Sequence, residues 1–260
     1  MIASGNTHTG SANLLRTYFA LGEASPGAKH HLEPGFEYCT GPYDHPICNF
    51  AANLSLDRMV ANRIFDIALD CPHFNVYSLD GDVPMSRFER QALLVESGFE
   101  KCYELTQMGW TPSCPAHQPQ IQPERGSDKR NEIASFMALQ FFPKYSSGFR
   151  RRIFEATALA QSLELYGIYL DGQLVAASML SEDESSIGLF NVCVDTAYRG
   201  RGLGRNLVAA AQFQAYEKQK FVCLQCNESL ITWYENQGFR TSGIVDVFGL
   251  PDKRRTAIMK

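Results

Sequence analysis

The sequence lacks the features that mark several large classes of protein. No run approaches the roughly 18 uninterrupted apolar residues that a membrane-spanning helix needs, and the amino terminus has no basic start followed by a long apolar stretch. The 24 basic and 28 acidic residues nearly balance, so no overall field favours nucleic acid or an anionic membrane. We therefore expect a cytoplasmic protein without nucleic-acid or membrane partners, in which any anion site is local.

Metal and redox motifs are equally scarce. Histidine is absent between Gln118 and Lys260, and the phosphate patterns G-x-x-x-x-G-K-S/T and G-x-G-x-x-G do not occur. The C-x-x-C pair of Cys223 and Cys226 lies in an apolar segment that predicts a strand, where residues three apart point to opposite faces. Without a second pair or a nearby histidine, we interpret both as reduced core thiols and expect no metal site.

The composition along the chain predicts four segments. Residues 1–35 resemble an arm with one brief helix, whereas residues 36–110 are globular in composition. Pro112, Pro115 and Pro119 then disfavour both helix and interior strand, which predicts a linker at 111–118. The remaining chain, 119–260, forms the second domain.

Residues that begin or end helices and strands recur at regular intervals in the second domain and predict an α/β fold. Ser127 or Asp128 is a candidate helix cap, Pro143 ends that helix, and Asp171-Gly172 joins two β-branched runs as in a hairpin. The predicted order is helix, helix, three strands, helix, strand, helix, strand. Such an order builds a mixed, mostly antiparallel sheet with helices on both faces.

A cluster of glycines separates a predicted strand from a predicted helix. Arg199, Gly202 and Gly204 stand at R-x-x-G-x-G spacing, with Gly200 between them. A helix that begins there directs unpaired N–H groups and its positive dipole end at one point, where a phosphate fits and where a β-carbon would hold the ligand away. A glycine-rich surface turn would show the same spacing, so the neighbouring residues must distinguish a phosphate-binding turn from an ordinary one.

Those neighbours carry a family resemblance. The block "LFNVCVDTAYRGRGLGRNLVAAAQ" and the later "CNESLITWYENQGF" resemble the GCN5-related N-acetyltransferase (GNAT) superfamily, whose pattern is a strand, R/Q-x-x-G-x-G/A, a helix, a strand and N-x-x-A-x-x-x-Y-x-x-x-G-F. The second motif reads Asn227, Leu230, Tyr234, Gly238 and Phe239, and departs only at Leu230, where a small residue is usual. The resemblance covers about residues 120–248.

The resemblance implies acetyl-CoA as cofactor and a set of residues that bind it. Backbone groups of Val192 and Val194 would pair with the amide-bearing arm, and an N–H near Cys193 would polarise the thioester. Asn227 would contact the coenzyme, and the Tyr234 hydroxyl would reach its sulfur as a general acid. The pyrophosphate would be held by the run Arg199, Gly200, Arg201, Gly202, Leu203, Gly204 and Arg205. We interpret the Cys193 side chain as packing, because direct transfer needs no acyl-enzyme.

The general base is not evident in the sequence. Many relatives place a glutamate on the strand that reads "GLFNVCV" here, where no carboxylate occurs. Asn191 could hold a water as part of the catalytic set, and the alternatives are Glu182–Glu184 and Asp195. Without a clear base, less basic amines are favoured as acceptors.

The front half resembles a second, degenerate copy. The segment from Leu93 to Met108 matches the segment from residue 233 to 248 at an offset of 140, with Leu94 in place of Tyr234 and no preceding glycine cluster. We therefore expect two tandem GNAT-like lobes, of which the front lobe binds no coenzyme; chance similarity is the alternative. The loop around His45 could face the substrate, or it could be an ordinary turn without a functional role.

The sequence thus predicts an acetyl-CoA-dependent N-acetyltransferase that moves an acetyl group to a primary amine by direct attack. The acceptor is a small-molecule or peptide amine, and the protein is a monomer or homodimer. A non-catalytic acyl-CoA-binding sensor or scaffold is the main alternative, disfavoured by Tyr234 and favoured by the missing base. An O-acyl or longer-chain transferase is the other.

Overall fold

The computed structural model describes residues 4–71, 73–80, 85–112, 118–126 and 128–251. Most of the predicted linker at 111–118, including Pro115, lies outside the described residues, as does the candidate cap Ser127. Below, the front half means the chain up to residue 110 and the back half means the chain from residue 118 onward.

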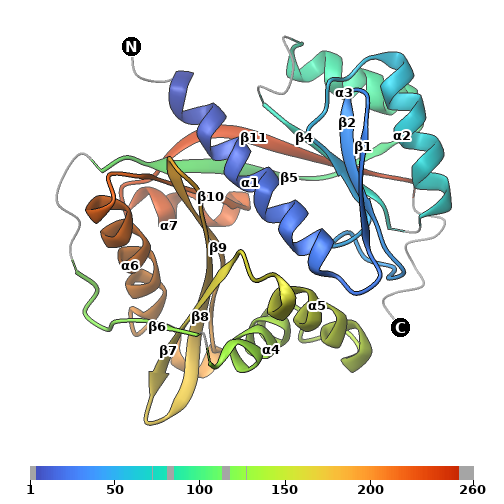
Figure 1. The fold of residues 1–260 in the computed structure, drawn as a ribbon. Helices are drawn as coiled ribbons and strands as arrows, with labels where there is room; N and C mark the ends of the chain where they lie inside the picture. Colours follow the sequence, from blue (N-terminus) through green and yellow to red (C-terminus); the bar gives the residue numbers. More distant parts are fainter. Residues whose placement is uncertain (1–3, 72, 81–84, 113–117, 127, 252–260) are drawn as a thin grey trace.

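All the described strands belong to one twisted sheet (Figure 1). Its order is β1-β2-β3-β4-β11-β5-β10-β9-β8-β7-β6, and neighbours are antiparallel except for the parallel pairs β3–β4 and β9–β10. The front half supplies β1 (Lys29–Glu33), β2 (Phe36–Thr40), β3 (Phe50–Ala52), β4 (Asn75–Leu79) and β5 (Glu100–Trp110). The back half supplies β6 (Glu124–Arg125), β7 (Glu164–Leu170), β8 (Gln173–Glu182), β9 (Ser186–Val194), β10 (Phe221–Cys226) and β11 (Arg240–Gly249). The predicted mixed, mostly antiparallel sheet is confirmed.

The two halves exchange their last strands. β5 pairs with β10 of the back half, whereas β11 pairs with β4 of the front half, and β5 and β11 run side by side across the middle of the molecule. In this central ladder Leu105 pairs directly with Val245, its counterpart at the offset of 140. An antiparallel pair of equivalent strands brings equivalent residues together only on a two-fold axis, so the halves are related by a pseudo-two-fold axis through this point.

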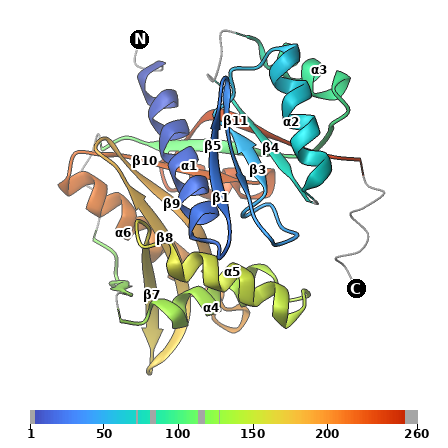
Figure 2. The ribbon, with the colours of Figure 1, turned by 45° about the vertical axis from the view of Figure 1, so that its right-hand side comes forward.

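Helices cover both faces of the sheet (Figure 2). Side chains along β11 point alternately to the two faces of the sheet, and each face packs against its own helices. Val245 and Val247 belong to one hydrophobic core, and Phe248 belongs to another. The face with Val245 carries α1 (Ser4–Ala24), α4 (Arg130–Phe141) and α5 (Ser147–Leu159). The opposite face carries α2 (Arg58–Asp70) and α3 (Arg87–Glu96) at the front end, and α6 (Leu203–Glu217) and α7 (Ile231–Glu235) at the back end. Two short 3-10 turns, η1 (Thr196–Tyr198) and η2 (Glu228–Leu230), complete the back half.

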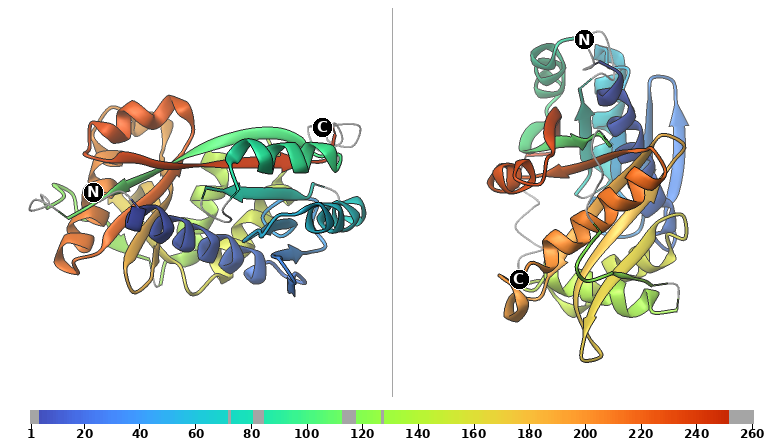
Figure 3. Two further views of the ribbon diagram at one scale, coloured as in Figure 1. Left: turned by 90° about the horizontal axis from the view of Figure 1, so that it is seen from above. Right: turned by 90° about the vertical axis from the view of Figure 1, so that its left-hand side faces the viewer.

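The amino-terminal segment differs from the expected arm with one brief helix. α1 has 21 residues and lies along the sheet, beside β9 and β10 and next to α5 (Figure 3). Its Leu14 and Phe19 are buried, and some of its polar side chains have tertiary partners: the Asn13 Nδ2 group donates to Ser181 O at 2.9 Å. Small polar residues favour loops when they are exposed, but here tertiary partners absorb them, so local composition was misleading.

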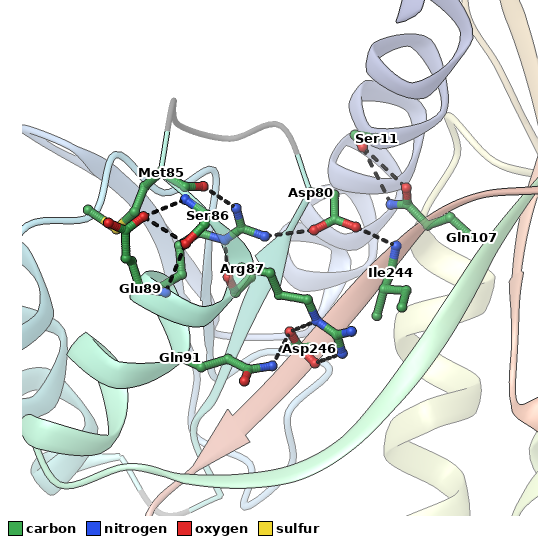
Figure 4. A network of polar contacts seen from close by, with 12 residues as sticks. Ser11, Asp80, Met85, Ser86, Arg87, Glu89, Gln91, Gln107, Ile244 and Asp246 are labelled. Atoms are coloured by element: carbon green, nitrogen blue, oxygen red, sulfur yellow. Dashed lines mark hydrogen bonds and ion pairs between the residues drawn. The ribbon is translucent and has the colours of Figure 1, made fainter. Parts of the chain in front are cut away.

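A polar network ties β11 to the front half (Figure 4). The Asp246 carboxylate is 1 % exposed and accepts hydrogen bonds from Arg87 Nη2 at 2.6 Å and from Gln91 Nε2 at 2.9 Å. Lys101 Nζ lies 2.8 Å from the same carboxylate. Burial alone would raise the pKa of Asp246, but the hydrogen bonds from Arg87 and Lys101 hold it well below its usual value. The exchanged strand is therefore fixed by charge as well as by backbone pairing.

Candidate active site

Strands β9 and β10 separate part-way along their length. Their parallel ladder pairs Ser186–Gly188 with Phe221–Cys223 and ends there. Beyond Gly188, β9 stays paired with β8 as far as Val194, and β10 stays paired with β5 as far as Cys226. The edge of β9 that faces β10 is therefore open over its last residues.

A bulge in β9 sets the direction of the backbone at this open edge. Asn191 has a φ of 51°, and the register against β8 shifts between Ala177 and Met179, beside it. After the bulge, Asp195 N donates to Val175 O across the β8 side at 2.9 Å. Because backbone groups alternate along a strand, those of Val194 point to the open side, where Val194 O accepts a bond from Arg199 Nε at 3.3 Å.

A cavity of about 860 Å³ follows this edge, and we call it the β9 cavity. It gathers most of the residues that the two sequence motifs predicted, from β9, the glycine cluster and α7. The predicted residues along its wall are Val192, Cys193, Val194, Arg199, Gly200, Gly202, Leu203, Gly204, Arg205 and Tyr234.

The glycine cluster leaves the start of α6 uncapped. Gly200 and Gly202 have φ values of 78° and 77°, and a Cβ on either would meet no atom within 4 Å. Gly202 is the N-cap of α6 and provides no side-chain oxygen, so the N–H groups of the first turn lack the usual capping partner. The space beside these groups is open and carries the positive end of the helix dipole.

Asn206, which the sequence analysis missed, holds this turn in place. Its buried side chain donates from Nδ2 to Gly202 O at 3.0 Å, and its Oδ1 accepts from Ile121 N at 2.8 Å. The available signal was an uncharged polar residue directly before Leu207, within a predicted helix.

Tyr234 and Cys193 are both buried at the wall of the cavity. Burial, and the neighbouring Cys226, raise the pKa of the Tyr234 phenol, which therefore stays protonated at neutral pH. Burial also raises the pKa of the Cys193 thiol to about 12. A thiol with such a pKa carries almost no thiolate at pH 7, which supports the packing interpretation of Cys193.

Two predicted coenzyme residues lie off this wall. The Arg201 guanidinium is exposed and lies 5.0 Å from the centre of the Tyr198 ring. Asn227 precedes η2 and accepts a hydrogen bond from Ser229 Oγ at 2.6 Å, so it touches the cavity only through Ser229. Lining residues that the sequence analysis did not single out are Gln140, Phe141, Tyr198, Ser229 and Trp233.

Three of the candidate bases, Glu182, Asp183 and Asp195, have other partners. Glu182 pairs with Lys218 Nζ at 2.5 Å and Lys220 Nζ at 2.7 Å, and these bonds lower the pKa of Glu182 even though burial opposes them. Asp183 accepts from Ser186 N, while Asp195 caps η1 by accepting from Ala197 N at 2.8 Å. Among the described residues, no carboxylate lines the β9 cavity.

A second cavity of about 350 Å³, which we call the inter-half cavity, adjoins the first. Asn191 lines it, while the next residue of β9, Val192, lines the β9 cavity, and Phe141 lines both. Its other walls come from α1, α4, α5, β3, β4, β5 and the loop at 45–47, so both halves contribute. The loop around His45 therefore faces a cavity, which is one of the two readings that the sequence allowed.

The C-x-x-C pair behaves as its strand position requires. Cys223 and Cys226 are both buried in β10. Cys226 packs in the core beside α6 and α7, whereas Cys223 lies toward α1 with Leu14. The two thiols thus point to opposite faces of the sheet, and the prediction of core thiols is confirmed.

The architecture and the open strand edge are those of the GNAT fold. Residues 161–241 match the family model described as an acetyltransferase (GNAT) domain, so the back half contains a GNAT domain. A GCN5-related N-acetyltransferase from Kribbella flavida is similar at a TM-score of 0.65 and 15 % identity, over 93 % of this chain and 96 % of that one. A tandem GNAT protein from the clavulanic acid biosynthesis pathway is similar at a TM-score of 0.58 and 13 % identity, over 95 % and 96 %.

A protein described as functionally unknown, from Staphylococcus epidermidis, is also similar, with a TM-score of 0.62 and 11 % identity over 86 % of this chain and 94 % of that one. No curated protein matches the sequence. Within the described residues, no helix combines the length and apolarity that crossing a membrane requires.

Proposed function

We propose that the protein is an acetyl-CoA-dependent N-acetyltransferase that acetylates a primary amine by direct attack. One observation carries the proposal: the open edge of β9 leads to the uncapped start of α6 on one side and to the buried phenol of Tyr234 on the other. A GNAT domain at 161–241 makes an acyl-CoA donor the general expectation, and acetyl-CoA is the specific donor that we propose.

The residues present fit the coenzyme. The N–H groups from Gly200 to Arg205 would bind its pyrophosphate, because they begin a helix without a cap and no Cβ stands in front of them. Arg199 and Arg205 would add charge-assisted bonds, and Arg201 and Asn227 would contact the coenzyme from the rim. The backbone of Val192 and Val194 would pair with its amide-bearing arm. The bound coenzyme supplies a thioester, whose acyl carbon is the electrophile.

Groups of the protein would then stabilise the negative charge of the intermediate and transfer the protons of the reaction. A backbone N–H near Cys193 on the open edge of β9 would stabilise the oxyanion while the C–N bond forms, and Tyr234 would give its proton to the sulfur as the C–S bond breaks. Burial keeps Tyr234 protonated and so available as an acid. Asn191 would position the amine or a water that removes its proton, and the amine itself must arrive uncharged to attack.

We also propose a division of labour along the chain. Residues 36–110 would be a degenerate lobe without coenzyme, joined by the linker at 111–118 to the catalytic lobe at 119–260. We further propose a cytoplasmic protein, since the described cysteines carry free thiols. We propose that it is a monomer or a homodimer.

The test measures thiol release from acetyl-CoA over a panel of primary amines. We expect turnover with at least one amine, and Tyr234→Phe should lower kcat by about 100-fold with little change in acetyl-CoA affinity, because only the leaving thiolate loses its acid. A non-catalytic acyl-CoA sensor is the competing function, favoured by the lack of a carboxylate along the β9 cavity among the described residues. Tight coenzyme binding without turnover of any amine would establish the sensor instead.

A further inference from the structure

The volume and position of the inter-half cavity indicate where the acceptor binds. It has the volume of a small-ligand site, and it meets the β9 cavity at Phe141 and at the bulge of β9. A molecule seated there would therefore lie next to the thioester that the proposed function places beside Tyr234. The following inference rests on that proposed function and names its acceptor.

The walls of this cavity are aromatic and apolar. Phe50 and Ala138 are buried in it, and Ile47, Phe141 and Phe142 line it as well. Among the described residues, none of the lining side chains is an aspartate, glutamate, lysine or arginine. A ligand that brings a carboxylate, phosphate or second ammonium would leave that charge buried without a partner, which is strongly unfavourable.

Three titratable groups that line the cavity, His45, Tyr18 and Tyr77, are also neutral. Burial lowers the pKa of His45 to about 3, and the nearby His73 lowers it further, so the ring is uncharged at physiological pH. His45 Nδ1 accepts from Ile47 N at 2.9 Å, which places the remaining ring proton on Nε2. Burial raises the pKa of both Tyr18 and Tyr77, and Tyr18 donates its hydroxyl hydrogen to Gln225 Oε1 at 2.6 Å.

An uncharged cavity also bears on the missing general base. An ammonium loses its hydration when it enters such a site, and the pKa of a buried amine falls accordingly. The acceptor therefore reaches the thioester in the neutral, nucleophilic form without a carboxylate to take its proton nearby. Acceptors that depend on a fixed counter-charge for binding are excluded for the same reason.

We propose that the acceptor is a primary amine with an aromatic or compact apolar body and no second charge, and that it sits in the inter-half cavity. Three probes share one ring and one aminomethyl group: benzylamine, 4-(aminomethyl)benzoate and 1,4-bis(aminomethyl)benzene. We expect kcat/KM for benzylamine to exceed that for either charged relative by at least ~10-fold, because each second charge is buried unpaired. Calorimetry of each amine with the full-length protein should give the same order of affinity.

A charge placed in the cavity should invert the preference. Ile47 is half-buried at the wall, and Ile47→Asp should weaken benzylamine and favour the diamine by at least ~10-fold in their ratio, because the new carboxylate pairs with the second ammonium. Leu139→Asp is the matched control, since Leu139 lies on α4 but is 50 % exposed and outside the cavity. That control should leave the ratio unchanged.

The outcomes separate this inference from the proposed function. Equal or better use of a charged relative, or failure of benzylamine to bind a protein that does bind acetyl-CoA, would overturn the assignment of the acceptor. Loss of the proposed function would appear differently, as acetyl-CoA that does not bind or is never turned over. In that case benzylamine binding, and its loss in Ile47→Asp but not in Leu139→Asp, still decides the character of the cavity.

Discussion

The amino ends of α2 and α6 occupy equivalent places in the two halves, because each helix connects the two strands of a parallel pair, β3–β4 or β9–β10. The two ends are capped differently. At α2 the Asp57 carboxylate accepts the N–H of Val60 at 2.7 Å. At α6 the N-cap is Gly202, which has no side chain to offer. In the front half the Asp57 carboxylate occupies the helix start, whereas in the back half the start of α6 is free to bind the anion of a ligand.

The helices before the exchanged strands show the same contrast. Gly98 and Gly238 both have positive φ values, 101° and 85°, and the phenylalanines that follow them, Phe99 and Phe239, are fully buried. Four residues before each glycine stand Leu94 and Tyr234, both buried. Positions that shape the backbone and core agree between the halves, whereas positions that would carry chemistry differ.

The largest expected effect comes from giving α6 the cap that α2 has. Gly202→Asp should weaken acetyl-CoA binding by at least ~100-fold, about 3 kcal/mol, because the carboxylate takes the N–H groups and repels the pyrophosphate. Isothermal calorimetry measures this. Gly172→Asp is the control: Gly172 has a φ of 79° and open space around it at the tip of the β7–β8 hairpin, so it carries the same backbone strain far from the site. Equal affinity in both variants would contradict the assignment.

The next effect concerns stability, which we expect the Asp246 network to support without acting on the site. Arg87→Met should lower the free energy of unfolding by about 2 kcal/mol, because Asp246 stays buried with fewer partners. Acetyl-CoA affinity should be unchanged. Denaturant titration and calorimetry on the same sample measure both.

The same network predicts a pH dependence. The pKa of Asp246 is depressed in the folded state, so its stabilising contribution is complete above its unfolded pKa of about 3.9 and is lost as the pH falls toward the folded value. Asp246→Asn should therefore flatten the loss of stability below about pH 4. An acid-unfolding curve that keeps its slope in this variant would show that other carboxylates dominate.

A smaller effect is expected from Asn206. Asn206→Ala leaves Gly202 O and Ile121 N without their side-chain partner and should cost about 1.5 kcal/mol of stability. Because the glycine turn loosens, acetyl-CoA affinity should also fall, by about 5-fold. Thermal unfolding with and without acetyl-CoA distinguishes the two contributions, and a stability loss with unchanged affinity would remove Asn206 from the positioning of the turn.

The smallest effect is the removal of the front-half cap. Asp57→Ala should cost about 1 kcal/mol of stability through the start of α2 and leave acetyl-CoA affinity unchanged. Denaturant unfolding and calorimetry test both parts. A change in coenzyme affinity would mean that the front half takes part in coenzyme binding.

The sequence predicted what local chemistry determines. The hairpin at Asp171-Gly172 and the helix that begins at the glycine cluster both appear in the structure. The offset of 140 makes Leu105 and Val245 equivalent residues, but neither their pairing nor the exchange of strands was predicted. Pairing partners are set by contacts between distant residues, which a local pattern does not encode.

The parts that escaped prediction depend on tertiary surroundings. α1 appeared as an arm because its small polar residues gain partners such as Ser181 only in the folded protein. Asn206 and Phe141 sit on predicted helices, but nothing local shows that one holds a turn and the other divides two cavities. Residues whose role depends on their place in the folded structure, such as Asn206 and Phe141, therefore cannot be recognised from a local sequence motif.

The exchanged strands also bear on how the chain reaches this structure. β4 belongs to the first third of the chain, yet its partner β11 is the last strand to leave the ribosome. The front half therefore cannot complete its sheet before residues 240–249 are synthesised, and until then one edge of β4 stays unpaired. Arrival of β11 joins the two halves across the middle of the sheet, so the cavity between them forms only after that strand is made.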